Sequence, residues 1–437
     1  MNNKHIQAGF HSVDFTPEPG LSLAGQMHHR VGEQALDPLM AVAAFFGGDE
    51  GAVALVSVDI CVLGNEFARE TASLFSRETG LPEESLLIHA THTHAAPAVT
   101  PLLEAEPDPA FRDRVQSAIL SAACTAVRSS RPAEVFSGTA SLDGPGFNRR
   151  GMFADGTSRM YGHSQSPGYV GLEGPRDPAL PVIWAKDETG NIAGMVIGFS
   201  THPTSLEAIW AYSADIPGAV RRWIQDHVGW PIPVVYMTGP AGNTSPMLLD
   251  PWDERRPFSG DDGLARCGCV IGNAALSKAL GTESKPIGCP AVRCRTERLQ
   301  IPIRPWPGPG DPTWPHPWDS AAAAYYEISR TDWDRRTREE NPVEVRVHAV
   351  RIGDTAICTS PAELFVEHGL AIRKDSPART TLLAELTDGY VGYMPTRLAF
   401  DRGGYETWPA PSSQLIPDAG DLVVRSTVRM LRQLWDE

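Results

Sequence analysis

The feature that most constrains the fold of this chain is an apolar stretch that ends in closely spaced histidines, residues 86–94. Leucine and isoleucine fill its first positions, which is typical of a short buried strand. Because side chains two apart on an extended chain point the same way, we expect His92 and His94 to share one face and His89 to face the other. Pro97 then ends regular pairing. Two imidazoles at a strand end suit a metal ligand beside a proton-transfer group, although such a pair alone is more often two surface histidines.

Composition restricts the class of protein and of partner. The chain has 437 residues, 42% of them hydrophobic and 21% charged, which is ordinary for a soluble globular protein. A net charge of −15 argues against nucleic acid or an anionic membrane surface as the main partner. No apolar run reaches the length of a membrane-spanning helix, so we expect no stable membrane insertion. The first residues lack a signal peptide's apolar core, which predicts a cytoplasmic location.

The cysteines predict reduced thiols rather than a disulfide framework, because their number is odd and several lie in apolar surroundings. A second zinc site built from Cys267, Cys269, Cys289 and Cys294 is disfavoured, because the first two lie in a helical segment and the spacing matches no common zinc pattern. The seven cysteines are Cys61, Cys124, Cys267, Cys269, Cys289, Cys294 and Cys358.

Apolar runs and helical periodicities alternate along the chain, without an internal repeat or a clear linker. This predicts an α/β fold, with mixed α+β as the alternative, in one large domain over residues 1–437. We expect mixed sheets flanked by helices, with a site at the strand ends, and we expect residues 151–175 to be flexible and 305–318 to be irregular. Strands are predicted at 10–15, 39–46, 52–58, 181–184, 192–199, 231–237, 299–303, 343–352, 355–359 and 381–385. Helices are predicted at 66–77, 112–129, 216–228, 263–280, 320–340, 363–374 and 418–435.

Several strands end in polar loops rich in glycine and proline, and ligands gather at such ends in layered α/β folds. Glu363 differs, because it follows Pro361 at a predicted helix start, where an acidic residue commonly offsets the helix dipole. Together these positions supply two histidines and a glutamate, which suits a catalytic zinc with open positions for water and substrate. The polar positions are Asp59, His92, His94, His202, residues 243–245 and Tyr393.

Five motifs of this sequence, in their order along the chain, resemble those of the neutral/alkaline (non-lysosomal) ceramidase family. The match spans nearly the whole chain. The resemblance implies a zinc amidase that cleaves the N-acyl bond of ceramide-like substrates. The motifs are Ala-Thr-His-Thr-His at 90–94, Phe-Asn-Arg at 147–149, His-Pro-Thr-Ser at 202–205, Ala-Gly-Asn-Thr-Ser-Pro at 241–246 and the segment 389–405.

The resemblance also implies site residues, with one zinc ion per chain. Asn243, which replaces the family's usual aspartate, would border the substrate beside Ser245. The implied zinc ligands are His92, His202, Glu363 and Tyr393. The other implied active-site residues are His94 beside the metal, Tyr405 at the oxyanion, and Arg149 and Ser245 at the substrate.

This sequence departs from the family in five respects. Asn243 removes a charge beside Ser245, and Met247 stands where asparagine is common. We expect no C-terminal immunoglobulin-like domain and no secretion signal, and the segment 305–318 has no clear counterpart. These departures weaken ceramide itself as the substrate more than they weaken the metal centre.

The predicted function is therefore zinc-dependent hydrolysis of an N-acyl amide bond. Zinc would lower the pKa of a bound water from about 15.7 toward 7, His94 would move its proton, and Ser245 would support the substrate rather than attack it. A soluble amide is favoured over a lipid-like one, because the chain is acidic and has no visible anchor. An esterase or lactonase on the same centre and a catalytically silent metal-binding homologue are the alternatives, and a homo-oligomer is left open.

Overall fold

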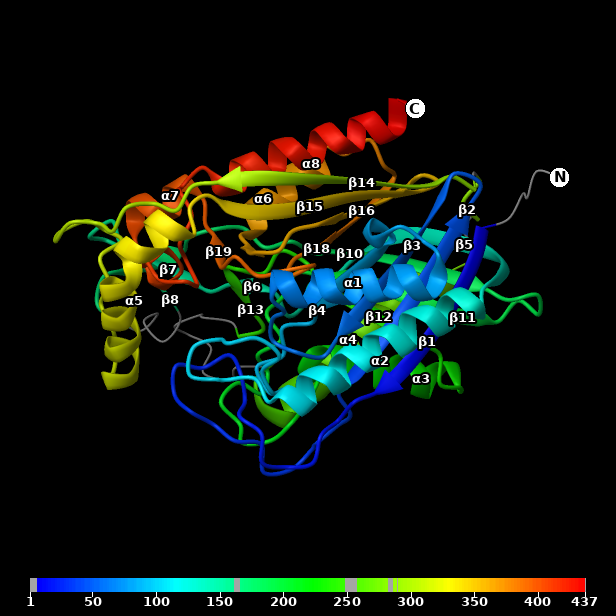
Figure 1. The fold of residues 1–437 in the computed structure, drawn as a ribbon, viewed down its shortest axis with the longest axis horizontal. Coiled ribbons are helices and arrows are strands. Elements are labelled where there is room, and N and C mark those ends of the chain that lie inside the picture. The colour runs from blue at the N-terminus through cyan, green and yellow to red at the C-terminus, as the bar shows by residue number, and fades with distance from the viewer. Residues whose placement is uncertain (1–5, 161–165, 248–257, 282–285, 289, 437) are drawn as a thin grey trace.

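The computed structural model describes residues 6–160, 166–247, 258–281, 286–288 and 290–436, which form four stacked layers (Figure 1). Two β-sheets lie face to face in the middle, and helices cover the outer face of each sheet. The interior between the sheets is one apolar cluster to which both sheets contribute side chains. This arrangement confirms the predicted mixed sheets flanked by helices.

The larger sheet has eight strands, and its neighbouring strands are antiparallel except for the pairs β3/β4 and β11/β12 at its two edges. In spatial order its strands are β12 (Val234–Thr238), β11 (Ile192–Phe199), β10 (Ala179–Lys186), β5 (Arg131–Ser141), β1 (Ile6–Asp14), β2 (Met40–Gly48), β3 (Gly51–Val58) and β4 (Leu86–Ala90).

The smaller sheet and the short ladders come mostly from the second half of the chain. The four-stranded sheet contains β14 (Val292–Ile301), β15 (Val343–Ile352), β16 (Thr355–Thr359) and β18 (Thr380–Ala384). The short ladders pair β13 (Thr244–Ser245) with β6 (Phe147–Asn148), β17 (Glu363–Leu364) with β19 (Tyr393–Met394), and β7 (Arg150–Phe153) with β8 (Ser158–Met160) and β9 (Tyr169–Leu172).

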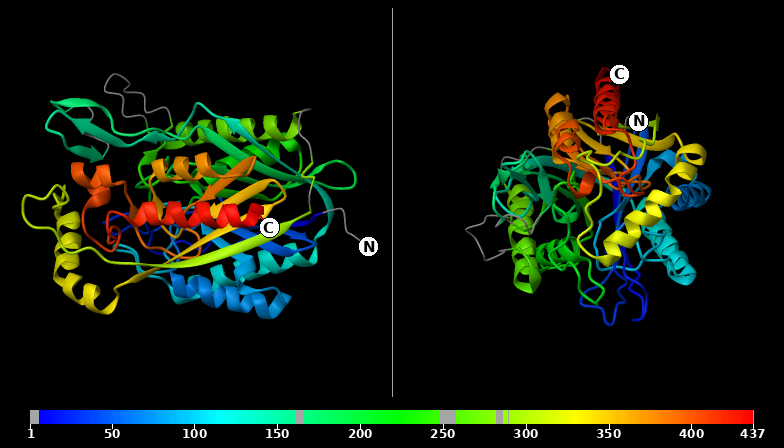
Figure 2. Two further views of the ribbon diagram at one scale, coloured as in Figure 1. Left: turned by 90° about the horizontal axis from the view of Figure 1, so that it is seen from above. Right: turned by 90° about the vertical axis from the view of Figure 1, so that its left-hand side faces the viewer.

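The helices divide between the two outer faces and one end of the sandwich. Those over the larger sheet are α1 (Asn65–Thr79), α2 (Pro109–Arg128), α3 (Asp215–Val228) and α4 (Gly260–Leu280). Those over the smaller sheet are α6 (Val366–Asp375) and α8 (Ala419–Asp436). Figure 2 shows α5 (Ser320–Glu339), α7 (Arg397–Arg402) and the β7–β9 sheet at the end far from both termini. Short 3-10 turns lie at Glu83–Ser85 and Tyr405–Thr407.

Strand β2 illustrates how one segment serves two layers. Its alternate side chains point to opposite faces, as strand geometry requires. Ala43 and Phe45 pack under the helices, whereas Val42 and Ala44 pack between the sheets. Both faces are therefore apolar, and such a strand reads as a continuous hydrophobic run.

One sequence prediction needs correction, and one strand was missed. The helix predicted from Glu363 begins only at Val366, because Glu363 lies in β17 and pairs with Tyr393 of β19. Strand β5 was not predicted, and its two neighbours are distant in sequence. In the described part of 151–175, for which flexibility is predicted, β8 and β9 pair with β7. Among the described residues, no helix combines the length and the apolar content that a membrane span requires.

Candidate metal centre

The two edge strands of the larger sheet, β4 and β12, meet where they end. Thr238 donates its backbone N–H to Nε2 of His89 at 2.8 Å, and its hydroxyl donates to the carbonyl of Thr91 at 2.8 Å. Nδ1 of His89 donates to the carbonyl of Glu385 at 2.7 Å. Burial lowers the pKa of His89 to about 3, so this ring is neutral and both its nitrogens are engaged. His89 thus joins the edges, and the loops after β4 and β12 lie together.

Backbone carbonyls orient two histidines in these loops. Nδ1 of His92 donates to the carbonyl of Cys61 at 2.8 Å, and Nδ1 of His202 donates to the carbonyl of Ala241 at 3.0 Å. Since a carbonyl can only accept, each Nδ1 carries the proton. When neutral, each ring therefore presents the lone pair of Nε2, which is the form that binds a metal.

The two Nε2 atoms face each other with a carboxylate beside them. They lie 3.0 Å apart, and Oε2 of Glu363 lies 3.4 Å from His92 and 3.5 Å from His202. Oε2 has no hydrogen-bond partner among the described residues. Two nitrogen atoms this close need a proton or a metal cation between them, and all three side chains are buried. Two imidazoles and one carboxylate form a donor set of catalytic zinc, so these residues fit a divalent metal.

Burial and neighbouring charges set the protonation of this group. Burial, with the positive charge of Arg149, lowers the pKa of His202 well below its ordinary value. Burial alone would raise the pKa of Glu363, but the charge of His92 and a hydrogen bond from Tyr393 bring it below its usual range. Although burial opposes it, Cys61 and Glu363 raise the pKa of His92 well above its ordinary value, so this ring carries a proton that a metal cation would displace. His202 is neutral and Glu363 is ionised, as metal coordination needs.

Tyr393 lies directly beside Glu363 because β17 and β19 pair in parallel at these two residues. Its hydroxyl accepts a hydrogen bond from Nη2 of Arg149 at 3.1 Å. Burial raises the pKa of this phenol well above its ordinary value, and the charge of Arg149 opposes that effect. Tyr393 therefore lies between Glu363 and Arg149 at the side of the group.

His94 lies at the edge of the group. Its Nε2 is 3.4 Å from Nε2 of His92, and its Nδ1 is 4.0 Å from Glu207. The ring packs on Gly25, where an added Cβ would lie 2.6 Å from Cγ of His94. The sequence argument for this proximity was wrong, because the strand ends at Ala90 and His92 has a φ of 71°. A left-handed residue, not strand alternation, brings the two rings together.

Arg149 is held within the protein from three sides. Its Nε donates to Oε1 of Glu406 at 3.0 Å, and its Nη2 donates to the carbonyl of Gly242 at 3.0 Å as well as to Tyr393. Arg150 donates to the other oxygen of Glu406 at 2.7 Å. The guanidinium of Arg149 is thereby fixed beside the candidate ligands.

Asn243, in the loop after β12, and Ser245, in β13, are fully buried. Oδ1 of Asn243 accepts from the backbone of Val366 at 2.9 Å, and its Nδ2 donates to Glu367 at 2.8 Å. Oγ of Ser245 accepts from the backbone of Met247 at 3.1 Å. The carboxyl group of Glu367 thus lies against Asn243, and burial raises its pKa.

An aromatic wall extends from the candidate ligands toward the surface. The ring of Tyr405 lies 5.7 Å from that of Tyr393 and 5.6 Å from that of Trp318. Trp408 contacts both Tyr405 and Trp318. Trp318 is 54% exposed, so the wall reaches solvent. Trp306, which lies in the same segment 305–318 as Trp318, is not part of this wall and packs on Trp333.

Sequence reasoning missed Tyr390, whose hydroxyl donates to Oε1 of Glu363 at 2.8 Å. This bond occupies one carboxylate oxygen and leaves Oε2 to face the histidines. Replacing Tyr390 by phenylalanine is expected to weaken metal affinity by roughly 10- to 100-fold, as the loss of such partners does elsewhere. Competition with a chelator measures the affinity. Tyr326→Phe is the matched control, because its buried hydroxyl has no hydrogen-bond partner among the described residues, and an equal loss there would contradict the assignment.

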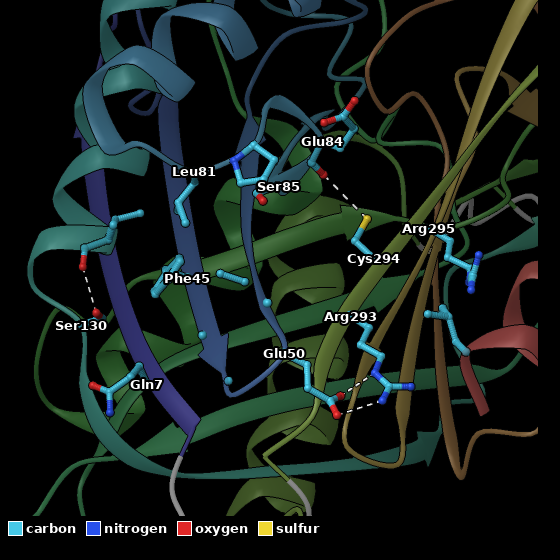
Figure 3. Close-up of a pocket in the computed structure, with 17 residues that line it drawn as sticks. Gln7, Phe45, Glu50, Leu81, Glu84, Ser85, Ser130, Arg293, Cys294 and Arg295 are labelled. Carbon is cyan, nitrogen blue, oxygen red and sulfur yellow. Dashed lines mark hydrogen bonds and ion pairs between the residues drawn. The ribbon is translucent and has the colours of Figure 1, made fainter. Parts of the chain in front are cut away.

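A cavity of about 1080 Å³ lies elsewhere, at the β2–β3 turn (Figure 3). It is about 25 Å from the histidines, by the length of β3. Arg293 pairs with Glu50 on its wall, and Sγ of Cys294 donates to the carbonyl of Glu84. No cluster of metal ligands lies there among the described residues, and neither Cys267, Cys269 nor Cys294 joins one; Cys289 lies outside the described residues.

The solved structures that are similar to this one include two ceramidase structures. A neutral ceramidase from Pseudomonas aeruginosa matches with a TM-score of 0.77 and 18% sequence identity, over 98% of this chain and 74% of that chain. The chain has the neutral ceramidase fold. A ceramidase complexed with C2 matches with a TM-score of 0.74 and 17% identity, over 98% of this chain and 75% of that one. No protein-family model matches the chain, and no curated protein matches it by sequence. The ceramidase resemblance is thereby confirmed for the fold.

Proposed function

We propose that this protein is a zinc-dependent hydrolase that cleaves an N-acyl amide bond in a soluble substrate. The observation that carries the proposal is the pair of buried imidazole Nε2 atoms 3.0 Å apart, with Oε2 of Glu363 3.4 and 3.5 Å from them. His92, His202 and Glu363 would hold the ion, with Tyr393 as the fourth ligand. When bound, zinc supplies a Lewis acid that polarises the acyl carbonyl and acidifies water.

His94 is assigned the proton transfers. Burial lowers the pKa of His94 well below the ordinary value, so the resting ring is neutral and one ring nitrogen has a lone pair for a proton. It takes the proton from the attacking water and returns it to the leaving amine. Its place beside His92, outside the three-ligand group, supports this role.

The remaining residues hold the substrate and the developing charge. Burial raises the pKa of the Tyr405 hydroxyl, which therefore remains a hydrogen-bond donor for the oxyanion, and one such donor is worth about 3 kcal/mol. Ser245 is assigned a supporting hydrogen bond to the substrate, and Arg149 a fixed positive charge beside it. Asn243 is already engaged by two protein groups, so we assign it the placement of this loop rather than a direct contact.

The aromatic wall supports an apolar acyl group in the substrate. Trp318→Ala is expected to raise KM for longer acyl chains by roughly tenfold with little change in kcat, because the side chain offers apolar area but no reacting group. Steady-state kinetics on an acyl-length series measure this. Trp230→Ala is the control, since that tryptophan is also exposed but lies outside the wall. An equal effect on all chain lengths would remove the acyl assignment.

The function is tested by elemental analysis of the purified protein and by a panel of matched amides and esters, together with a short-chain fluorescent ceramide. About one zinc per chain with amide cleavage is expected. Cleavage of esters alone would replace the amidase with an esterase or lactonase. Zinc without turnover on any substrate would indicate a silent homologue, and release of fatty acid from the ceramide would overturn the soluble substrate.

A further inference from the structure

A cysteine that the proposed reaction does not use lies against the metal centre. Cys61 follows the end of β3 and is 2% exposed. Its carbonyl orients His92, and its Sγ lies 3.6 Å from Nδ1 of the same ring. The residue that orients one ligand thus places its thiol beside that ligand.

The thiol also completes a second group of donor atoms. Sγ of Cys61 and ring nitrogens of His92 and His94 all lie within 4.8 Å of one another. This group shares only His92 with the group of His92, His202 and Glu363. The chain therefore offers two neighbouring positions for a cation, and one ring belongs to both.

The two positions differ in chemistry. Two imidazoles and a carboxylate suit zinc, whereas a thiolate with two imidazoles favours softer cations. We infer that Cys61, His92 and His94 form an inhibitory site for a thiophilic divalent cation such as Cd²⁺. On binding, the Cys61 thiol gives its proton to solvent, and the proton on Nδ1 of His92, the ring atom that faces the thiol, moves to Nε2. One sulfur–cadmium bond and the nitrogen–cadmium bonds then form without any change of oxidation state.

Occupancy of this site has two consequences. It withdraws His92 from the first group, so zinc is held less tightly. It also occupies His94, which the proposed function uses for proton transfer. The second consequence rests on the proposed function, but the binding itself does not.

Cadmium titration of the full-length zinc-loaded protein, followed by the ultraviolet sulfur-to-cadmium charge-transfer absorption, tests the inference. Wild type and Cys61→Ser share all other thiols, so the difference between their spectra isolates Cys61. The absorption attributable to Cys61 is expected in wild type and lost in Cys61→Ser. Cys358→Ser, which removes a buried thiol outside both donor groups, is expected to retain it.

Zinc content and circular dichroism accompany the titration. Cys61→Ser is expected to keep its fold and zinc, because the carbonyl rather than the thiol orients His92. Cys61→Ala is the second variant, should serine disturb the fold. Identical spectra for wild type and both Cys61 variants, or an equal loss in Cys358→Ser, would overturn the inference. An absence of zinc from wild type would instead contradict the proposed function. The cadmium titration would still test the Cys61 site independently of that result.

Discussion

Replacing His92 by alanine is expected to remove the metal and the hydrolytic activity together. His92 belongs to the three-ligand group and contacts both other members of it. Without it, His202 and Glu363 are left as two ligands, and the loss of activity should exceed the 10²- to 10³-fold that removal of one oxyanion donor typically costs. Elemental analysis and amide hydrolysis on the same sample measure both effects.

The backbone at His92 requires a second variant. Its φ of 71° is left-handed, and alanine adopts that conformation at a cost of roughly 1–2 kcal/mol. Asparagine tolerates it and lacks the imidazole, so His92→Asn separates loss of the ligand from backbone strain. His227→Ala, which removes an exposed histidine of α3, should retain metal and activity. Full activity with bound metal in both His92 variants would exclude this residue as a ligand.

Local patterns were sufficient to predict much of the sandwich. The hairpin of β2 and β3 follows from two apolar runs around a glycine-rich turn, and α4 follows from its helical spacing. Strand β5 escaped detection because its buried positions cover only its middle. Its pairing with β1 and β10 is non-local, and no short sequence window contains that information.

Non-local strand pairing also explains why the prediction at Glu363 was wrong. A proline followed by a helical pattern predicted a helix start, yet pairing with Tyr393 draws Glu363 into a strand. Tertiary pairing here overrides local propensity. The consequence is functional, because the pairing sets Glu363 beside Tyr393 rather than at the end of a helix dipole.

The candidate centre was only partly accessible from sequence. His92 and His202 each follow an apolar strand, and that signal was visible. Their meeting, across 110 residues of sequence, depends on the approach of β4 to β12 through His89 and Thr238. The ligand set came from the family resemblance, not from spacing. Tyr390 and Cys61 carry no motif of their own, so only coordinates could reveal their contacts.

Replacing His94 by alanine is expected to leave the metal in place and to reduce turnover by roughly 10²- to 10⁴-fold, the usual contribution of a general acid–base group. The three-ligand group does not include His94, so zinc content should match wild type. KM should change little, because the ring acts on the proton rather than on substrate binding.

Added imidazole separates this role from a structural one. The alanine variant leaves a space beside Gly25, against which the His94 ring packs, and free imidazole is expected to restore part of kcat there. It should restore nothing in His92→Asn, which lacks a ligand rather than a proton carrier. His29→Ala, at an exposed position of the neighbouring N-terminal loop, is the control. Unchanged turnover in a metal-loaded His94→Ala protein would move the proton transfers to another residue, and Tyr405 would then be the first to replace.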